Sequence, residues 1–254
     1  MALRPLTLFV LALVVTLPVP APAVAQDLSQ TAVDQSFASQ FFIARRTDPG
    51  GDEHVEVLGS LIIWFLMALS IVSIGLTGNL AMSNQRKAIM PAGAVDEARR
   101  LLSSGDYRGA LEATGRDPSD FGRILHAALS EASHGFAAVL QGLEQTADEL
   151  ATIRLRRIEY LNVLGQVCPM IGLFGTVYGM ILAFQAIVGA GGNADPVLLA
   201  GGIGTALTTT FWGLVVAIPA LSGYGIIRNK IDELNAEATV TAEELLKQFR
   251  PKPK

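Results

Sequence analysis

The chain contains little charge, and one long stretch of it contains almost none. Only 17% of the residues are charged, below the roughly 25% typical of soluble domains. Residues 160–194 and 196–227 carry no formal charge on either side of Asp195. Each of these runs exceeds the roughly 20 residues that a helix needs to cross a bilayer. The sequence therefore predicts a transmembrane hairpin with its turn near Asp195.

Other residue types are scarce in ways that exclude whole classes of function. The single cysteine, Cys168, rules out an intrachain disulfide and a cysteine-based metal site, and we expect it to serve as a small packing residue. A net charge of −4 without a clustered basic face argues against a nucleic-acid partner. His126 and His134 have no further metal-ligating residues near them, and no serine has an evident histidine partner. We predict no enzymatic activity, no cofactor and no metal site.

The N-terminus has the features of a secretory signal peptide. Arg4 supplies the positive region, Leu6–Leu17 the apolar core, and Ala23-Val24-Ala25 a small-residue cleavage site. We predict a signal peptide over residues 1–25 and an exported segment over residues 26–57. An uncleaved anchor is the alternative, although three prolines follow the core and the core is too short to span.

A third uncharged run, over residues 57–85, precedes the hairpin and is long enough to cross the membrane. We predict spans at 58–82, 160–190 and 197–227, with an outer turn at 191–196. Basic residues flank all three spans on one side, which by the positive-inside rule faces the cytoplasm. The fold class is an all-α membrane protein with three transmembrane helices and long cytoplasmic helical extensions, oriented N-out and C-in. The flanking basic residues are Arg86, Lys87, Arg154, Arg156, Arg157, Arg228 and Lys230.

The regions predicted to be cytoplasmic, residues 83–159 and 228–254, are helical in pattern. Residues 95–114 indicate two short helices broken at Ser104-Gly105-Asp106. From Phe121 onward, apolar residues recur at helical spacing into the second span, which predicts one very long helix whose weak point is Gly135. A similar stripe continues the third span inward. We expect the two stripes to form a helical bundle between subunits, with packing inside one subunit as the alternative.

The hairpin itself is rich in small and hydroxyl residues. Small residues three or four apart allow helices to approach closely, and a proline inside a span bends it where neighbours can satisfy the freed carbonyls. Threonines in such a helix either bond to their own backbone or line a polar path. Both interpretations remain open. The predicted packing residues are Pro169, Gly172, Gly175, Gly179, Gly213 and Pro219, and the predicted path-lining residues are Thr176, Thr205, Thr209 and Thr210.

Two segments of the hairpin carry a family resemblance. Val167–Phe184 reads VCPMIGLFGTVYGMILAF, and Ile203–Pro219 reads IGTALTTTFWGLVVAIP. Both resemble the MotA/TolQ/ExbB proton-channel family, nearest its ExbB and TolQ branch. The motif similarity is strong over about residues 155–228 and is supported by topology over 58–250. The exported segment lies outside it.

The resemblance implies a homo-oligomeric ring, a pentamer, around the helices of an ExbD/TolR-like single-span partner whose membrane Asp carries the proton. It also implies that Thr176 and Thr210 face the pore, and a TonB-like energy transducer is a further candidate partner beside membrane lipid. Many ExbB and TolQ proteins place a Glu where this chain has Thr205. With Thr205 at that position, the predicted spans contain no Asp, Glu, Lys, Arg or His. The titrating carboxylate would then belong to the partner.

These features lead to one principal hypothesis and two rivals. We predict a channel-scaffold subunit of an inner-membrane motor, driven by the proton motive force, that energises transport across the cell envelope. A non-conducting structural membrane scaffold is the alternative. A secondary transporter is disfavoured by the small number of spans and by the lack of intramembrane charge.

Overall fold

The computed structural model describes residues 41–47, 53–193 and 196–247 of the 254-residue chain. The predicted signal peptide, most of the exported segment and Asp195 lie outside the described residues. All of the described residues belong to one compact unit, and the description below concerns that unit alone.

Within the described residues, three helices are long and apolar enough to cross a membrane. They are α3 (Val57–Ser83), α8 (Phe136–Gly189) and α9 (Pro196–Leu246). The three predicted spans lie within these helices, except that Ala190 is the residue that caps α8. The predicted all-α class with three transmembrane helices is confirmed.

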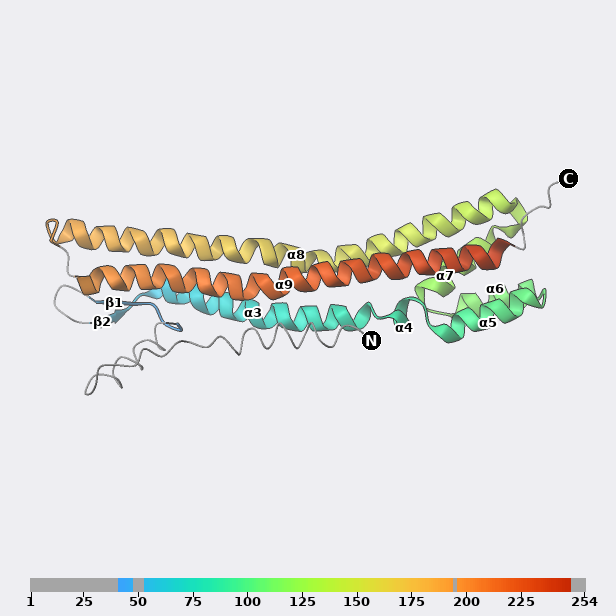
Figure 1. Cartoon of the computed structure of the whole chain (residues 1–254), viewed down its shortest axis with the longest axis horizontal. Coiled ribbons are helices and arrows are strands. Elements are labelled where there is room, and N and C mark those ends of the chain that lie inside the picture. Colours follow the sequence, from blue (N-terminus) through green and yellow to red (C-terminus); the bar gives the residue numbers. More distant parts are fainter. Residues whose placement is uncertain (1–40, 48–52, 194–195, 248–254) are drawn as a thin grey trace, which may run out of the picture. The chain divides into compact units, whose positions relative to one another are not determined.

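The three long helices pack against one another. α8 and α9 lie side by side along their length, and α3 contacts both of them (Figure 1). The turn between α8 and α9 contains Gly191 and Gly192, whose φ angles of 62° and 93° favour glycine. We call the end of the spans near this turn and the start of α3 the hairpin end, and the opposite end, where Arg154 lies, the charged end.

A small antiparallel β-hairpin is an unexpected addition near the hairpin end. β1 (Arg45–Thr47) pairs with β2 (Glu53–Val55) in the register Arg45↔Val55. The hairpin leads directly into α3, and β1 contacts α9. A part of the predicted exported segment is therefore attached to the spans.

The structure corrects the prediction of one continuous helix from Phe121 into the second span. The chain instead forms α7 (Asp120–Ser130), a 3-10 turn (Ala132–His134) and then α8 from Phe136. Gly135 causes the break, because its φ of 96° lies in the left-handed region that other residues rarely adopt. The apolar spacing continues across the break, so periodicity alone did not reveal it.

Shorter helices beyond the charged end fold back on the long pair. They are α4 (Arg86–Ile89), α5 (Ala92–Ser103) and α6 (Tyr107–Arg116), and the expected break at Ser104-Gly105-Asp106 separates the last two. Gly105, with a φ of 78°, forms that turn. Asp106 caps α6 by accepting a hydrogen bond from the Gly109 N–H at 2.9 Å.

These helices enclose one apolar core with the ends of α8 and α9, which we call the extramembrane cluster. The structure favours the alternative of packing inside one subunit over a bundle between subunits, because most side chains of both stripes are buried in this core. The reason is the backward turn of α5, α6 and α7, which local periodicity does not specify. The cluster contains Met90, Val95, Ala98, Leu102, Ala110, Phe121, Ile124, Leu125, Ala128, Leu129, Val139, Leu143, Ala147, Leu150, Ala238, Ala242 and Leu246.

Candidate functional site

The contact between α8 and α9 inside the membrane is made through glycine, and we call it the seam. A Cβ added at Gly172 would lie 2.9 Å from the Thr209 carbonyl oxygen and 3.1 Å from the Thr210 Cα. A Cβ added at Gly179 would lie 2.6 Å from the Gly202 carbonyl oxygen. The atoms in the way are backbone, which cannot rotate aside as a side chain can. Hydrogen is therefore the only substituent that both positions accept at this helix separation.

The remaining predicted packing residues lie along the same seam or within the same helices. Gly175 is buried against the Thr209 side chain, and a Cβ added at Gly213 would lie 2.9 Å from the Cys168 carbonyl oxygen and 3.3 Å from the Pro169 Cα. Pro169 thus lies on the seam in the interior of α8, and Pro219 lies in the interior of α9. Each proline removes one N–H from its helix and so frees a carbonyl one turn earlier.

Two of the predicted path-lining threonines meet the seam at Gly172. Thr209 is completely buried, and its hydroxyl lies 2.9 Å from the Ala206 carbonyl oxygen and 3.3 Å from that of Gly172. The Thr210 hydroxyl lies 3.4 Å from the Gly172 oxygen, and this side chain is only partly buried. One carbonyl of α8 therefore faces two hydroxyl donors from α9.

The other two predicted path-lining threonines lie elsewhere on the subunit. Thr205 is 6% exposed, donates to the Gly201 carbonyl at 3.1 Å and faces α3, where a Cβ added at Gly59 would lie 2.9 Å from its Cγ2. Thr176 donates to the Leu173 carbonyl at 2.7 Å within its own helix and remains partly exposed. The four threonines therefore do not form one cluster within a subunit.

Polar contacts at the hairpin end join the segment before α3 to both helices of the seam. The Tyr178 hydroxyl of α8 donates to Glu56 Oε1, while Glu56 Oε2 accepts from the Gly59 N–H at 3.0 Å and so caps α3. Trp212 of α9 donates through Nε1 to the Phe41 carbonyl at 2.7 Å. Sequence reasoning missed these residues. The available signal was that Glu56 is the last charge before the first apolar run.

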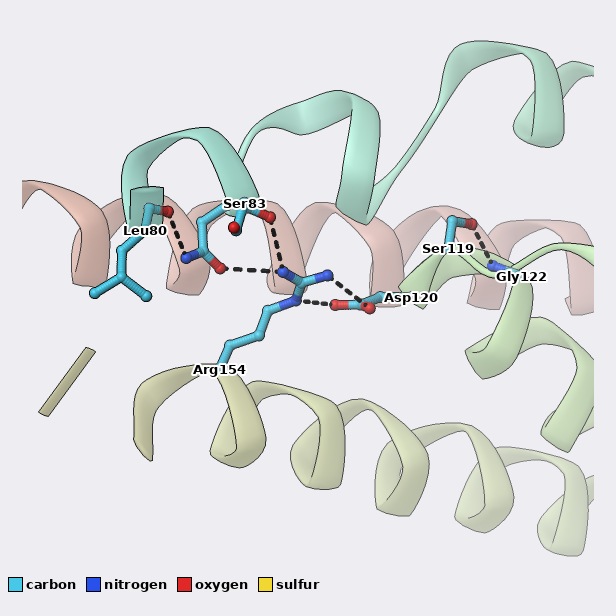
Figure 2. Close-up of polar contacts among 7 residues, drawn as sticks. Leu80, Ser83, Ser119, Asp120, Gly122 and Arg154 are labelled. Atoms are coloured by element: carbon cyan, nitrogen blue, oxygen red, sulfur yellow. Dashed lines mark hydrogen bonds and ion pairs between the residues drawn. The ribbon is translucent and has the colours of Figure 1, made fainter. Parts of the chain in front are cut away.

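A buried ion pair joins three helices at the charged end. Arg154 of α8 contacts Asp120 at the start of α7 through Nε and, at 2.9 Å, through Nη2 (Figure 2). The two side chains are only 16% and 9% exposed. Arg154 Nη1 also donates to the Ser83 carbonyl at 3.2 Å and to the Asn84 side chain at 3.1 Å, where α3 ends. The sequence identified Arg154 only as a flanking charge, because its partners are distant along the chain.

A second, exposed ion pair joins α4 to α9. Arg86 donates through Nη1 to Glu237 Oε2 at 2.7 Å and contacts Oε1 at 2.5 Å through Nη2. The hydrogen bond and charge of Glu237 raise the pKa of Arg86 above its ordinary value. This pair is exposed, so removing one of its partners should cost less than removing one partner of the buried Arg154–Asp120 pair.

The seam is therefore an uncharged helix contact with hydroxyl groups along it, and it offers hydrogen bonding but no strong acid or base. No Asp, Glu, Lys, Arg or His lies in residues 57–85, 160–194 or 196–227. Among the residues that the structure describes, no group of three or more His, Cys, Asp or Glu side chains could hold a metal ion.

The sequence profile of the MotA/TolQ/ExbB proton channel family matches residues 112–239, which include the seam and the Arg154–Asp120 pair. The chain is 28% identical over 195 residues to the biopolymer transport protein ExbB of Neisseria meningitidis, covering 74% of this chain and 86% of that protein.

Two further relatives match over shorter stretches. The chain is 33% identical over 141 residues to the biopolymer transport protein ExbB homolog of Methanothermobacter thermautotrophicus, covering 56% of this chain and 48% of that protein. It is 38% identical over 81 residues to the Tol-Pal system protein TolQ of Haemophilus influenzae, covering 32% and 35%. The matched stretches therefore span about half the length of these two relatives or less.

Proposed function

Because this chain belongs to the MotA/TolQ/ExbB proton channel family, in its ExbB/TolQ branch, we propose that it is the channel-scaffold subunit of a motor driven by the proton motive force. The chain is a multi-pass protein of the bacterial inner membrane. The motor would energise transport across the cell envelope, with a TonB-like protein as a candidate transducer of the movement.

The observation that carries this proposal is the uncharged seam. A proton that moves past the seam finds hydroxyl groups and the Gly172 carbonyl but no carboxylate of the spans to hold it. An ionisable group within a membrane is costly and marks a proton site when it is present. We therefore propose that the proton-binding Asp belongs to an ExbD/TolR-like single-span partner enclosed by a ring of this chain, a pentamer.

The exposure of the threonines narrows the proposed lining of the path. Thr176 and Thr210 are partly exposed on the subunit, whereas Thr205 and Thr209 are buried against neighbouring helices. We propose that Thr176 and Thr210 contact the path directly and that Thr205 and Thr209 hold the helices that form it. The basic residues at the charged end support an orientation with that end in the cytoplasm.

A proton-flux measurement tests the proposal. The chain is coexpressed with an ExbD/TolR-like partner, the complex is reconstituted into liposomes, and proton entry is followed with a pH-sensitive dye. The Thr176→Val/Thr210→Val double variant should lose most of the flux, because it removes both hydroxyls that the proposal places in contact with the path, and conduction depends on the hydrogen-bonding groups that line a pore. The matched control is Thr77→Val on α3, whose hydroxyl bonds to the Ser73 carbonyl of its own helix at 2.8 Å.

The outcomes separate the motor from its rival. Unchanged flux in a correctly assembled double variant would overturn the assignment of Thr176 and Thr210. Absence of flux in the wild-type complex with its partner, together with normal assembly, would instead support a non-conducting membrane scaffold.

A further inference from the structure

An open groove of about 480 Å³ lies between α8 and α9 at the charged end of the spans. Its lining combines two arginines, two tyrosines and apolar side chains, among them Leu155, Arg156, Tyr160, Val163, Tyr224 and Arg228. The groove lies at the boundary of the uncharged region, because Glu159 is the last charge before the second span and Arg228 the first after the third. It is distant along both helices from the seam glycines.

The polar groups of the groove are connected to one another, and they include two arginines and one carboxylate, Glu159. Arg228 Nη1 donates to the Tyr224 hydroxyl at 3.1 Å, and that hydroxyl donates to Glu159 Oε2 at 3.3 Å. Glu159 Oε1 also accepts from Asn162 at 2.7 Å. Among the described residues, no carboxylate forms an ion pair with Arg156 or Arg228. With two arginines and one glutamate, the groove has a net positive charge.

The groove also opens onto apolar surface that continues toward the spans. Tyr160 is 68% exposed and Val163 is 51% exposed, and both lie on α8 where the uncharged run begins. Tyrosine is favoured at the headgroup level of a membrane because its ring is apolar and its hydroxyl is polar. The groove thus places two arginines beside an exposed apolar surface within one site.

We propose that this groove binds the phosphate headgroup of an anionic phospholipid. The phosphate lies between Arg156 and Arg228, because guanidinium groups are well suited to binding phosphate. An acyl chain follows the exposed side of α8 past Val163. Basic grooves between transmembrane helices are the kind of site that holds such headgroups. The proposal requires only that the helices cross a membrane, and it does not depend on proton conduction.

The test measures lipid binding to the detergent-extracted full-length protein by native mass spectrometry. Short-chain phosphatidylglycerol is titrated against phosphatidylcholine. We expect Arg156→Gln or Arg228→Gln to weaken phosphatidylglycerol binding about fivefold, and the double variant about thirtyfold, from roughly one interfacial charge contribution for each arginine. The control, Arg157→Gln/Arg123→Gln, removes two exposed arginines outside the groove and should leave binding unchanged.

A charge-conserving variant guards against a folding defect. Arg156→Lys/Arg228→Lys should stay within about threefold of the wild type, because most of the attraction comes from charge. Equal binding of phosphatidylcholine, or undiminished phosphatidylglycerol binding by the folded glutamine double variant, would overturn the proposal. Equally strong competition by millimolar inorganic phosphate would identify a free-anion site instead.

If the glutamine double variant changes its subunit number but binds phosphatidylglycerol as the wild type does, a second copy of the chain occupies the groove. That outcome would also overturn the proposal. None of these results bears on proton flux, so the proposed function is tested separately.

Discussion

The seam and the extramembrane cluster are built from the same two helices, yet they are held together by opposite means. At the seam, α8 and α9 touch through glycine and backbone, with threonine hydroxyls bridging them. In the cluster, the same helices contribute apolar side chains to a core shared with α5 and α7, and a buried ion pair joins α8 to α7. In water, apolar side chains gain free energy by being buried, whereas in lipid they gain nothing from leaving the lipid tails. A helix contact in the membrane must therefore use close approach.

The largest effect should come from breaking the ion pair at the charged end. Asp120→Ala leaves Arg154 buried with only neutral partners, and we expect the free energy of unfolding to fall by about 3 kcal/mol. Thermal unfolding of the detergent-solubilised protein measures this loss. The control is Glu112→Ala, which removes the exposed Arg116 pair and should cost no more than about 0.5 kcal/mol. Equal losses of stability for the two variants would show that burial does not increase the cost of breaking an ion pair in this protein.

Exchanging both partners sharpens the same point. Asp120→Leu with Arg154→Met removes the two charges together, so no ion is left unpaired, and the double variant should be more stable than Asp120→Ala. A double variant less stable than Asp120→Ala would mean that the remaining Arg154 contacts with Ser83 and Asn84 outweigh the cost of an unpaired charge.

A smaller loss is expected at the seam from a single methyl group. Gly172→Ala places a Cβ 2.9 Å from the Thr209 carbonyl oxygen, so the helices must separate, at a cost of about 2 kcal/mol. Gly225→Ala on α9 is the control, since nothing lies within 4 Å of its added Cβ. The two melting temperatures should differ by several degrees, with Gly225→Ala close to wild type. If both variants melt together, close approach at Gly172 does not stabilise the seam.

The smallest effect should come from the bridging hydroxyl. Thr209→Val keeps the shape of the side chain but removes the donor to the Gly172 and Ala206 carbonyls, and we expect a loss of about 0.6 kcal/mol, the average for such bonds in membranes. Thr239→Val, whose hydroxyl bonds within α9 beyond the membrane, should change stability less. Chemical denaturation of both variants resolves the difference. A loss of several kcal/mol at Thr209 would mean that hydroxyl bonds, rather than close approach, dominate the seam.

The extent of the sequence predictions follows from how local each feature is. The spans could be predicted because run length and the absence of charge are properties of a single segment. The break between α5 and α6 could be predicted for the same reason, since Gly105 and its neighbours form the turn themselves. By contrast, the apolar stripe after Phe121 crosses Gly135 without changing its spacing, so the broken helix was not predicted.

The polar contacts show the same limit at single residues. Arg154 was identified from its position next to a span, but Asp120 and Asn84 come from other helices, so its ion pair could not be inferred. Glu56 and Tyr178 are separated by 122 positions, so their contact could not be inferred from neighbours along the chain. Thr209 and Thr205 were identified by residue type, but the sequence does not show which neighbouring helix each side chain packs against.

The sequence by itself therefore determined the class of protein, the three spans, their lack of intramembrane charge and the motifs of the ExbB and TolQ branch. These depend on composition and on neighbours along the chain. Only the tertiary structure decided that the apolar stripes pack within one subunit, that Thr205 faces α3 while Thr209 faces α8, and that Arg154 pairs with Asp120. Each of these depends on which distant segment comes within contact distance. That choice depends on how the whole set of helices excludes water and lipid, and no single segment specifies it.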